Sequence, residues 1–247
     1  MPLTFSHPAI ILPAKYLPEK WVSMTALIVG SVTPDFEYFI RLREESFYTH
    51  TLAGMVCLDL PVALLLTFIY HYIVRNLFIC NIPGFFRKRF SPYMNFNWWQ
   101  YFKQHFWVVM ICLLVGISSH LFWDSFTHPD GYFVREIPVL RQSTYIMGNR
   151  MLYARVVQTI STIVGAAVIL FAIMQMPASN KSVAPNSPID YWLIIIGAGV
   201  AVSCIRVASY TYGLWVEATA IPFLSGIIAG SIIAPLFIPK NANNGMM

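Results

Sequence analysis

Five long apolar stretches follow one another along the chain, separated by shorter polar segments. They lie at about 52–74, 106–124, 156–176, 191–208 and 214–238. Each comes near the roughly 20 apolar residues that a helix needs to cross about 30 Å of hydrocarbon. The stretches are continuously apolar and lack the alternation over ~10 residues that is typical of membrane barrel strands. The pattern predicts an all-α, polytopic helical membrane bundle of about five spans.

A shorter apolar segment at 21–32 precedes the first of these stretches. At about 1.5 Å of rise per residue it is too short to cross a bilayer. We therefore expect a half-buried or re-entrant helix, which would bring Pro34 and Asp35 to one membrane face. The prolines and aromatic residues of the first 20 positions are not those of a secretory signal.

Composition supports a membrane protein, with 57% hydrophobic and only 11% charged residues, against about 25% charged in ordinary soluble domains. The net charge is +5. The segment between the first two spans has basic residues and no acidic one: Arg75, Arg87, Lys88, Arg89 and Lys103. The positive-inside rule predicts that this segment is cytoplasmic. Its many aromatic neighbours indicate contact with membrane lipids and not with nucleic acid.

The chain divides by chemistry into two halves. Residues 1–155 hold all six histidines and nearly all carboxylates, whereas residues 156–247 form a predicted three-span bundle without histidine. A polar loop at 177–188 lies within the second half, and we expect Arg206 and Glu217 to pair between its last two spans. The four cysteines form no C-x-x-C pair, so neither a disulfide framework nor a thiolate zinc site is predicted.

The end of the second span carries polar residues in a helical pattern. His120, Asp124 and His128 recur at intervals of four, which places them on one helical face. Ionisable side chains within a membrane segment are costly and indicate a functional site. The competing interpretations are a hydrogen-bonded pair for His120 and Asp124, and a helix-end cap for His128 before Pro129.

Topology brings further residues to the same side. Because the first two spans run in opposite directions, His50 lies at the face where the second span ends, and His71 and His105 lie at the opposite, interfacial face. His7 and Asp35 join this face if segment 21–32 does not cross. The candidate metal ligands are therefore His7, Asp35, His50, His120, Asp124 and His128. For Asp35 the alternative is a helix N-cap, and for His7 an interfacial residue.

Imidazole and carboxylate ligands without thiolate suit a divalent metal, zinc first, with manganese, iron or nickel as alternatives. Six candidate ligands allow one or two ions, and either Asp35 or Asp124 could bridge a pair. Such a metal activates water and polarises an ester or phosphoryl oxygen. Glu37 is the candidate general base, with Glu136 as a second choice; the alternative for Glu37 is a solvated residue in a first helical turn.

Four motifs occur in order: Thr4-Phe-Ser-His7-Pro, Gly30-Ser-Val-Thr-Pro34-Asp35-Phe-Glu37-Tyr, Thr49-His50-Thr-Leu-Ala-Gly54 and Ser119-His120-Leu-Phe-Trp-Asp124-Ser-Phe-Thr-His128. Over residues 1–135 this series resembles an uncharacterised bacterial polytopic membrane family, catalogued as a domain of unknown function. It is similar in pattern to inner-membrane-associated metal-dependent hydrolases. The resemblance implies metal-dependent hydrolysis and supplies no substrate.

Together these observations predict an integral membrane metal-dependent hydrolase of the bacterial inner membrane. We expect it to act at the outer face on an amphiphilic or lipid-linked ester or phosphoester. A transporter or a protein that handles protons or cations is one alternative and predicts a continuous polar path through the bundle. A non-catalytic scaffold, in which metal only fastens the N-terminal segment, is another. A haem between two histidines fits less well, because the histidines gather at one interface.

Overall fold

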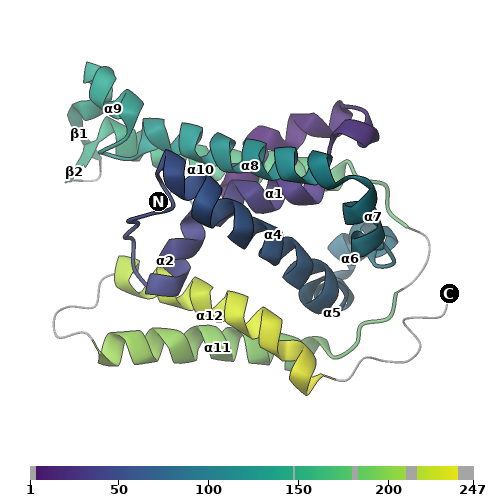
Figure 1. The fold of residues 1–247 in the computed structure, drawn as a ribbon. Helices are drawn as coiled ribbons and strands as arrows, with labels where there is room; N and C mark the ends of the chain where they lie inside the picture. Colours follow the sequence, from purple (N-terminus) through teal and green to yellow (C-terminus); the bar gives the residue numbers. More distant parts are fainter. Residues whose placement is uncertain (1–3, 147, 180–182, 210–215, 239–247) are drawn as a thin grey trace. The chain divides into compact units, whose positions relative to one another are not determined.

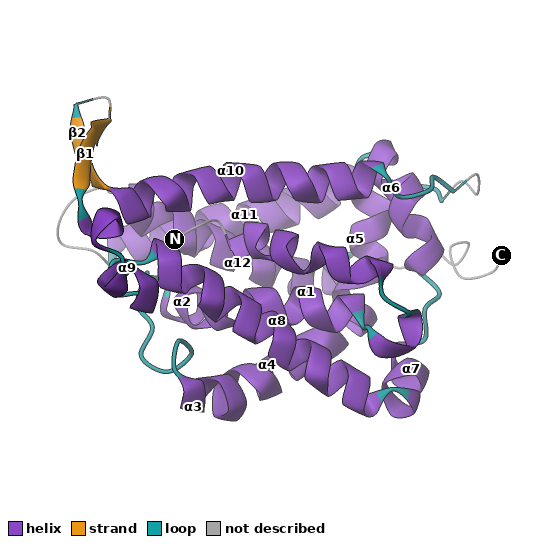
Figure 2. Ribbon diagram, turned by 90° about the horizontal axis from the view of Figure 1, so that it is seen from above, coloured by secondary structure: helices purple, strands orange, loops and turns teal. Residues whose placement is uncertain are grey.

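A computed structural model of the chain describes residues 4–146, 148–179, 183–209 and 216–238 (Figure 1). Helices dominate this part of the chain (Figure 2). The α-helices are α1 (Met24–Val32), α2 (Phe36–Arg41), α3 (Leu52–Gly54), α4 (Leu60–Ile69), α5 (Arg75–Asn81), α6 (Gly84–Phe90), α7 (Trp98–Gln104), α8 (Phe106–Thr127), α9 (Tyr132–Glu136), α10 (Tyr153–Met174), α11 (Pro188–Ala208) and α12 (Val216–Phe237). Short 3-10 helices are η1 (Thr4–Tyr16), η2 (Glu19–Trp21), η3 (Thr33–Asp35), η6 (Ser91–Tyr93) and η7 (Pro138–Arg141), and π-helical turns are η4 (Met55–Asp59) and η5 (Tyr70–Val74).

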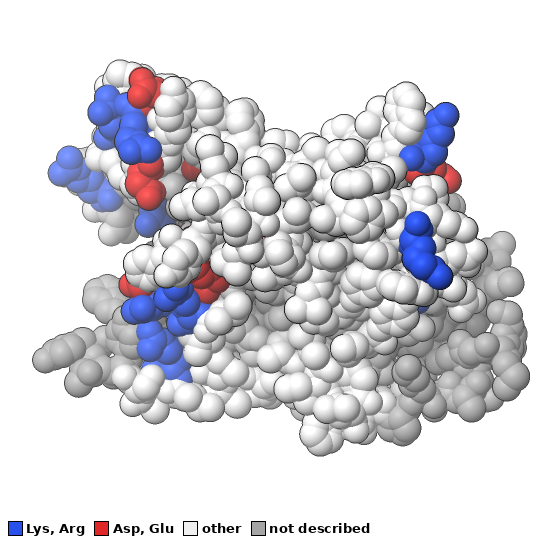
Figure 3. Space-filling model, viewed as in Figure 1, with Lys and Arg blue, Asp and Glu red and all other residues white. Residues whose placement is uncertain are grey.

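The predicted all-α polytopic bundle is confirmed. Five helical stretches of the described chain are long and apolar enough to cross a membrane: Leu52–Asn81, Phe106–Glu136, Tyr153–Met174, Pro188–Ala208 and Thr219–Phe237. The first is longer than predicted because α5 continues it beyond residue 74. On the face drawn in the space-filling view, Lys, Arg, Asp and Glu gather near the left and right margins and the surface between them is uncharged (Figure 3). An uncharged surface suits contact with hydrocarbon, where charged side chains are costly.

The structure adds one element that the sequence did not predict, and it leaves part of two predictions undescribed. A short antiparallel hairpin, β1 (Ser143–Ile146) with β2 (Asn149–Leu152), was not predicted, because its segments carry no sustained apolar alternation. The start of the last predicted span and the Arg206–Glu217 pair fall partly on positions outside the described residues.

The described chain forms two compact units. Unit 1 comprises residues 1–35, 47–64 and 102–175, and unit 2 comprises residues 36–46, 65–101 and 176–247. The units do not follow a single cut at residue 155, because α10 packs with η1 and α8 in unit 1. All six candidate metal ligands belong to unit 1, and Glu37 belongs to unit 2.

Unit 1 is built around the close packing of α1 on α8. The two helices cross at Gly30 and Gly116, where a Cβ on either glycine would collide with backbone of the other helix. Leu113 and Ile117 are fully buried on the same face of α8. The small residues therefore bring the α1 backbone, and the turn that follows it, against the His120 face of α8.

The segment predicted at 21–32 forms α1, a nine-residue helix. Ser23 caps its N-terminus by accepting a hydrogen bond from the Ala26 amide over 3.4 Å. Its buried positions include Ala26 and Leu27, and Ile28 is exposed. The expectation of a short, half-buried helix is confirmed.

Unit 2 packs α11 against α12 through small residues, Gly199 and Gly226. Arg75, at the start of α5, donates hydrogen bonds to the carbonyls of Met94 (2.6 Å) and Phe96 (2.8 Å) and is 6% exposed. His71 is buried and stacks on Trp98, with 4.5 Å between ring centroids. This ring is part of the packing of unit 2, and its place at the opposite membrane interface stays a prediction.

Candidate metal centre

The α8 helix presents three of the predicted ligands at its C-terminal end. His120 and Asp124 lie one turn apart on the buried face and are 0% and 5% exposed. His128 follows the last helical turn with φ −94° and ψ 141°, the extended conformation that a residue before proline favours. Its ring still faces the helix, with Nδ1 3.5 Å from Asp124 Oδ1. His128 thus ends the helix and also faces the cluster.

Asp35 reaches the cluster from the 3-10 turn that follows α1. The Thr4 hydroxyl donates a hydrogen bond to Asp35 Oδ2 over 2.6 Å, and Asp35 Oδ1 lies 3.4 Å from His120 Nε2. The side chain is 1% exposed. Both carboxylate oxygens therefore face other segments of unit 1, which favours the ligand interpretation of Asp35 over a helix N-cap.

His50 enters from the loop before α3. Thr51 caps that helix by accepting a hydrogen bond from the Gly54 amide (2.9 Å), which fixes the chain next to His50. The His50 Nε2 atom lies 3.4 Å from Asp124 Oδ2 and 4.0 Å from Asp35 Oδ1. Its other nitrogen, Nδ1, lies 3.1 Å from the Thr49 hydroxyl.

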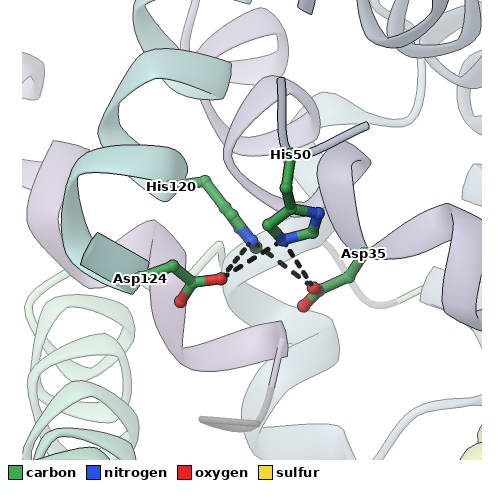
Figure 4. Close-up of side chains that lie close together, drawn as sticks. All are labelled: Asp35, His50, His120 and Asp124. Carbon is green, nitrogen blue, oxygen red and sulfur yellow. Dashed lines mark ion pairs between the residues drawn. The ribbon is translucent and has the colours of Figure 1, made fainter. Parts of the chain in front are cut away.

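Four ligand atoms converge on one point (Figure 4). One atom each from Asp35, His50, His120 and Asp124 lies within 4.8 Å of the other three. The His120 Nε2 to Asp124 Oδ2 distance is 3.2 Å. Zinc bonds of 2.0–2.2 Å in a tetrahedron place neighbouring ligand atoms about 3.3–3.6 Å apart. Three of the four nitrogen–oxygen separations, at 3.2–3.4 Å, lie close to this spacing, and the fourth, between His50 Nε2 and Asp35 Oδ1, is 4.0 Å.

His120 is held in the orientation that a metal requires. Its Nδ1–H donates a hydrogen bond to the Ser31 carbonyl over 2.8 Å, so Nε2 is the ring nitrogen that faces Asp35 and Asp124 and that could bind a metal after losing its proton. Metal-binding histidines almost always have such a second hydrogen bond. The spacing of residues along the sequence could not indicate Ser31, because only its backbone takes part.

His7 reaches the cluster from η1. Its ring stacks on that of His120, with 3.8 Å between centroids, and its Nε2 lies 3.5 Å from Asp124 Oδ1. Burial, together with the nearby His120 ring, lowers the pKa of His7 to about 3. His7 is therefore a neutral imidazole near pH 7, the form that binds metal. His7 therefore lies beside the other candidate ligands of unit 1, and its role as a metal ligand stays a prediction.

The polar atoms of the cluster are buried and under-satisfied. Within the described chain no hydrogen bond is made by either nitrogen of His7, by Nε2 of His120, by Oδ1 of Asp35 or by either oxygen of Asp124. Leaving a buried polar group unpaired costs about 1–3 kcal/mol. Burial raises the pKa of Asp35, but the favourable interaction with His120 outweighs it and holds this pKa below its ordinary value. An ionised carboxylate among converging imidazole nitrogens fits a divalent cation.

Glu37, the candidate general base, lies in α2. Its carboxylate accepts hydrogen bonds from Arg41 Nε (2.7 Å) and from the Ser46 hydroxyl (3.1 Å). It is 7% exposed, so the alternative of a solvated first-turn residue is wrong. Its role as general base stays a prediction. Glu136, the second choice, is exposed at the end of α9.

The fold and the cluster define a class: a polytopic helical bundle, whose described residues include five helices able to cross a membrane and a buried histidine–aspartate centre in unit 1. Comparison with protein families assigns the chain to one family. The chain belongs to the family described as a domain of unknown function (DUF4184), whose model matches residues 1–236. The match extends well beyond the four motifs. No curated protein and no solved structure matches the chain.

Proposed function

We propose that the protein is an integral membrane hydrolase that depends on a divalent metal, bound by Asp35, His50, His120 and Asp124. One observation carries the proposal: ligand atoms from these four residues lie within 4.8 Å of one another. They come from three separate segments, the turn after α1, the loop before α3 and α8. Bringing them together buries Nε2 of His120, Oδ1 of Asp35 and both oxygens of Asp124 without a hydrogen bond in the described part of the chain, which is costly unless a cation satisfies them.

The donor set indicates the chemistry. Imidazole and carboxylate ligands without thiolate are typical of catalytic zinc, and also suit manganese, iron or nickel. When bound, such an ion lowers the pKa of a water to about 7 and polarises an ester or phosphoryl oxygen. The protein's own part is orientation: Ser31 fixes the His120 ring through Nδ1, and Thr4 fixes the Asp35 carboxylate through Oδ2.

A cavity beside the cluster supports an amphiphilic substrate. It has a volume of about 410 Å³ and includes His7 in its wall. The rest of the lining is mostly apolar and comes largely from α10, including Ile160, Val164 and Val168. Pockets of this size suit small organic ligands. A hydrocarbon chain placed there would leave the ester or phosphoester head beside the metal ligands.

For location, we propose the bacterial inner membrane, with the centre towards the outer face. The basic segment after the first span supports a cytoplasmic position for that end of the span. Membrane lipids and an amphiphilic small molecule are the partners that follow from this arrangement.

A scaffold role is the second candidate, and one observation favours it. The cluster joins η1, the turn after α1, the loop before α3 and α8, so a bound ion would also fasten these segments to one another. A scaffold predicts that chelation lowers stability and that the metal-loaded protein has no turnover. A cation or proton transporter predicts movement of the ion across sealed vesicles.

The test is metal content by mass spectrometry on full-length protein purified in detergent without chelators. Wild type should carry the ion, and a His120→Ala/Asp124→Ala double variant should lose it. His105→Ala is the matched control, because it removes an imidazole about 22 Å along the axis of α8 from His120. Metal retained in the double variant would refute the site.

Turnover is then measured with a soluble phosphomonoester, a phosphodiester and a long-chain carboxylic ester, on the metal-loaded and chelated protein. Hydrolysis of any of them that depends on metal and on His120 supports the hydrolase. Metal-loaded protein without turnover on all three contradicts it and favours the scaffold.

A further inference from the structure

We propose that the centre has a second cation position, formed by His7, His128 and Asp124, and that the Asp124 carboxylate bridges the two ions. The inference concerns the same cluster as the proposed hydrolase and rests on that function for its catalytic meaning. Its geometric basis is independent, because it depends on how the two oxygens of a single carboxylate are placed.

The two oxygens of Asp124 face different pairs of imidazoles. Oδ2 lies 3.4 Å from His50 Nε2 and 3.2 Å from His120 Nε2. Oδ1 lies 3.5 Å from His7 Nε2 and 3.5 Å from His128 Nδ1. A carboxylate that binds a single ion needs only one pair of imidazoles near it. Because each oxygen of Asp124 has its own pair of imidazoles, the carboxylate is placed to bridge two ions.

Asp35 is not equivalent to Asp124, although the sequence allowed either to bridge. Only its Oδ1 faces the imidazoles, at 3.4 Å from His120 and 4.0 Å from His50. Its Oδ2 accepts the hydroxyl of Thr4 at 2.6 Å. Asp35 is therefore a ligand of the first position alone, and the bridge falls to Asp124.

The polar atoms of His7 and His128 also need a partner. Both nitrogens of each ring are buried and make no hydrogen bond within the described residues. The His7 side chain is 1% exposed and that of His128 is 17% exposed. The first position is complete without them, since four ligand atoms already converge there. A cation on the Oδ1 side of Asp124 would satisfy one nitrogen of each ring.

The number of ligands suggests different tasks for the two positions. The first has four protein ligands and the second has three, so the second leaves more room for water or substrate. Two ions that share a carboxylate are a recurring arrangement for phosphoester hydrolysis, in which both the attacking and the leaving oxygen need stabilisation. The second position therefore narrows the proposed substrate class to phosphoesters.

The experiment counts ions. Full-length protein in detergent is stripped with a chelator, reloaded with Zn²⁺ or Mn²⁺ and freed of excess metal, and its metal content is measured by mass spectrometry. Wild type should hold two equivalents and His128→Ala one, whereas His105→Ala should keep two. His128 is chosen because it is partly exposed and lies after the last turn of α8, so its replacement should disturb the fold less than replacement of a buried residue. His7→Ala should also hold one equivalent, provided that size-exclusion chromatography and circular dichroism show it to be folded.

Electron paramagnetic resonance on the Mn²⁺-loaded protein gives a readout that needs no turnover. Wild type should show two magnetically coupled ions, and His128→Ala an isolated one. One equivalent in both proteins overturns the second position and leaves the proposed hydrolase intact. Two equivalents in folded His128→Ala and His7→Ala overturn the ligand assignment. Two coupled ions in wild type without turnover on any ester support the second position and contradict only the hydrolase.

Discussion

Thr4 and Asp35 lie 31 positions apart in the sequence, and the hydroxyl of Thr4 donates a 2.6 Å hydrogen bond to Oδ2 of Asp35. Both side chains are 1% exposed. The contact fixes one oxygen of the carboxylate and directs the other towards His120 Nε2, 3.4 Å away. The N-terminal η1 segment thereby helps to orient a ligand of the proposed first metal position.

This contact gives the first prediction. Thr4→Val keeps the side-chain shape but removes the donor, so the Asp35 carboxylate is no longer held in place. Loss of a group that supports a ligand typically weakens metal binding 10–100-fold. Competition with a chromophoric chelator measures that change, and Thr4→Ser, which keeps the hydroxyl, should stay near wild type. Equal affinity in Thr4→Val and wild type would show that the hydrogen bond does not support metal binding.

Removal of metal should destabilise the protein. A ligand that binds only the folded state stabilises it by about 2.7 kcal/mol at 100 times its dissociation constant. We therefore expect a chelator to lower the unfolding midpoint of wild type in detergent. The His120→Ala/Asp124→Ala variant should unfold at the same point with and without chelator. A chelator effect of equal size in both proteins would place the responsible ion elsewhere.

Close packing of α1 on α8 should be essential for assembling the ligands. Gly116→Val would drive a side chain into the Leu27 carbonyl and the backbone of α1, and overpacking of this kind costs about 1–3 kcal/mol. We expect weaker metal binding as well, because Ser31 lies in α1 and Asp35 lies in the turn that follows it. Gly197→Ala in α11 is the control, since a Cβ there meets no atom within 4 Å. Denaturant titration of the protein in detergent measures the loss of stability, and mass spectrometry measures the loss of metal. A Gly116→Val protein as stable as Gly197→Ala would refute the role of close helix packing.

The cavity beside His7 predicts a dependence on chain length. Val164→Phe would fill part of the 410 Å³ space without changing any proposed ligand. We expect kcat/KM to fall several-fold for a long-chain phosphoester, about 1 kcal/mol of lost binding, and to stay unchanged for a short soluble one. Leu170→Phe, also exposed on α10 but not part of the cavity lining, is the control. An equal loss on both substrates would mean that the cavity does not hold the chain.

Much of the fold was predictable because it depends on local composition. Continuous apolar runs near the length of a membrane crossing predicted five spans, and the shortness of 21–32 predicted a helix that is only partly buried. The interval of four between His120, Asp124 and His128 placed their side chains on one helical face, since α-helical geometry is regular. Opposite directions of successive spans placed His50 at the same end.

The tertiary structure decided the contacts that no spacing encodes. Gly30 and Gly116 let two backbones approach, which brings the Ser31 carbonyl to His120 and the Asp35 carboxylate to His120. The buried position of His71 against Trp98 depends in the same way on residues distant in the chain. The sequence by itself determined which residues share a helical face and a membrane side, because these follow from helix period and span length. Which oxygen of Asp124 faces which imidazole depends on side-chain packing between separate segments, and only the folded chain sets it.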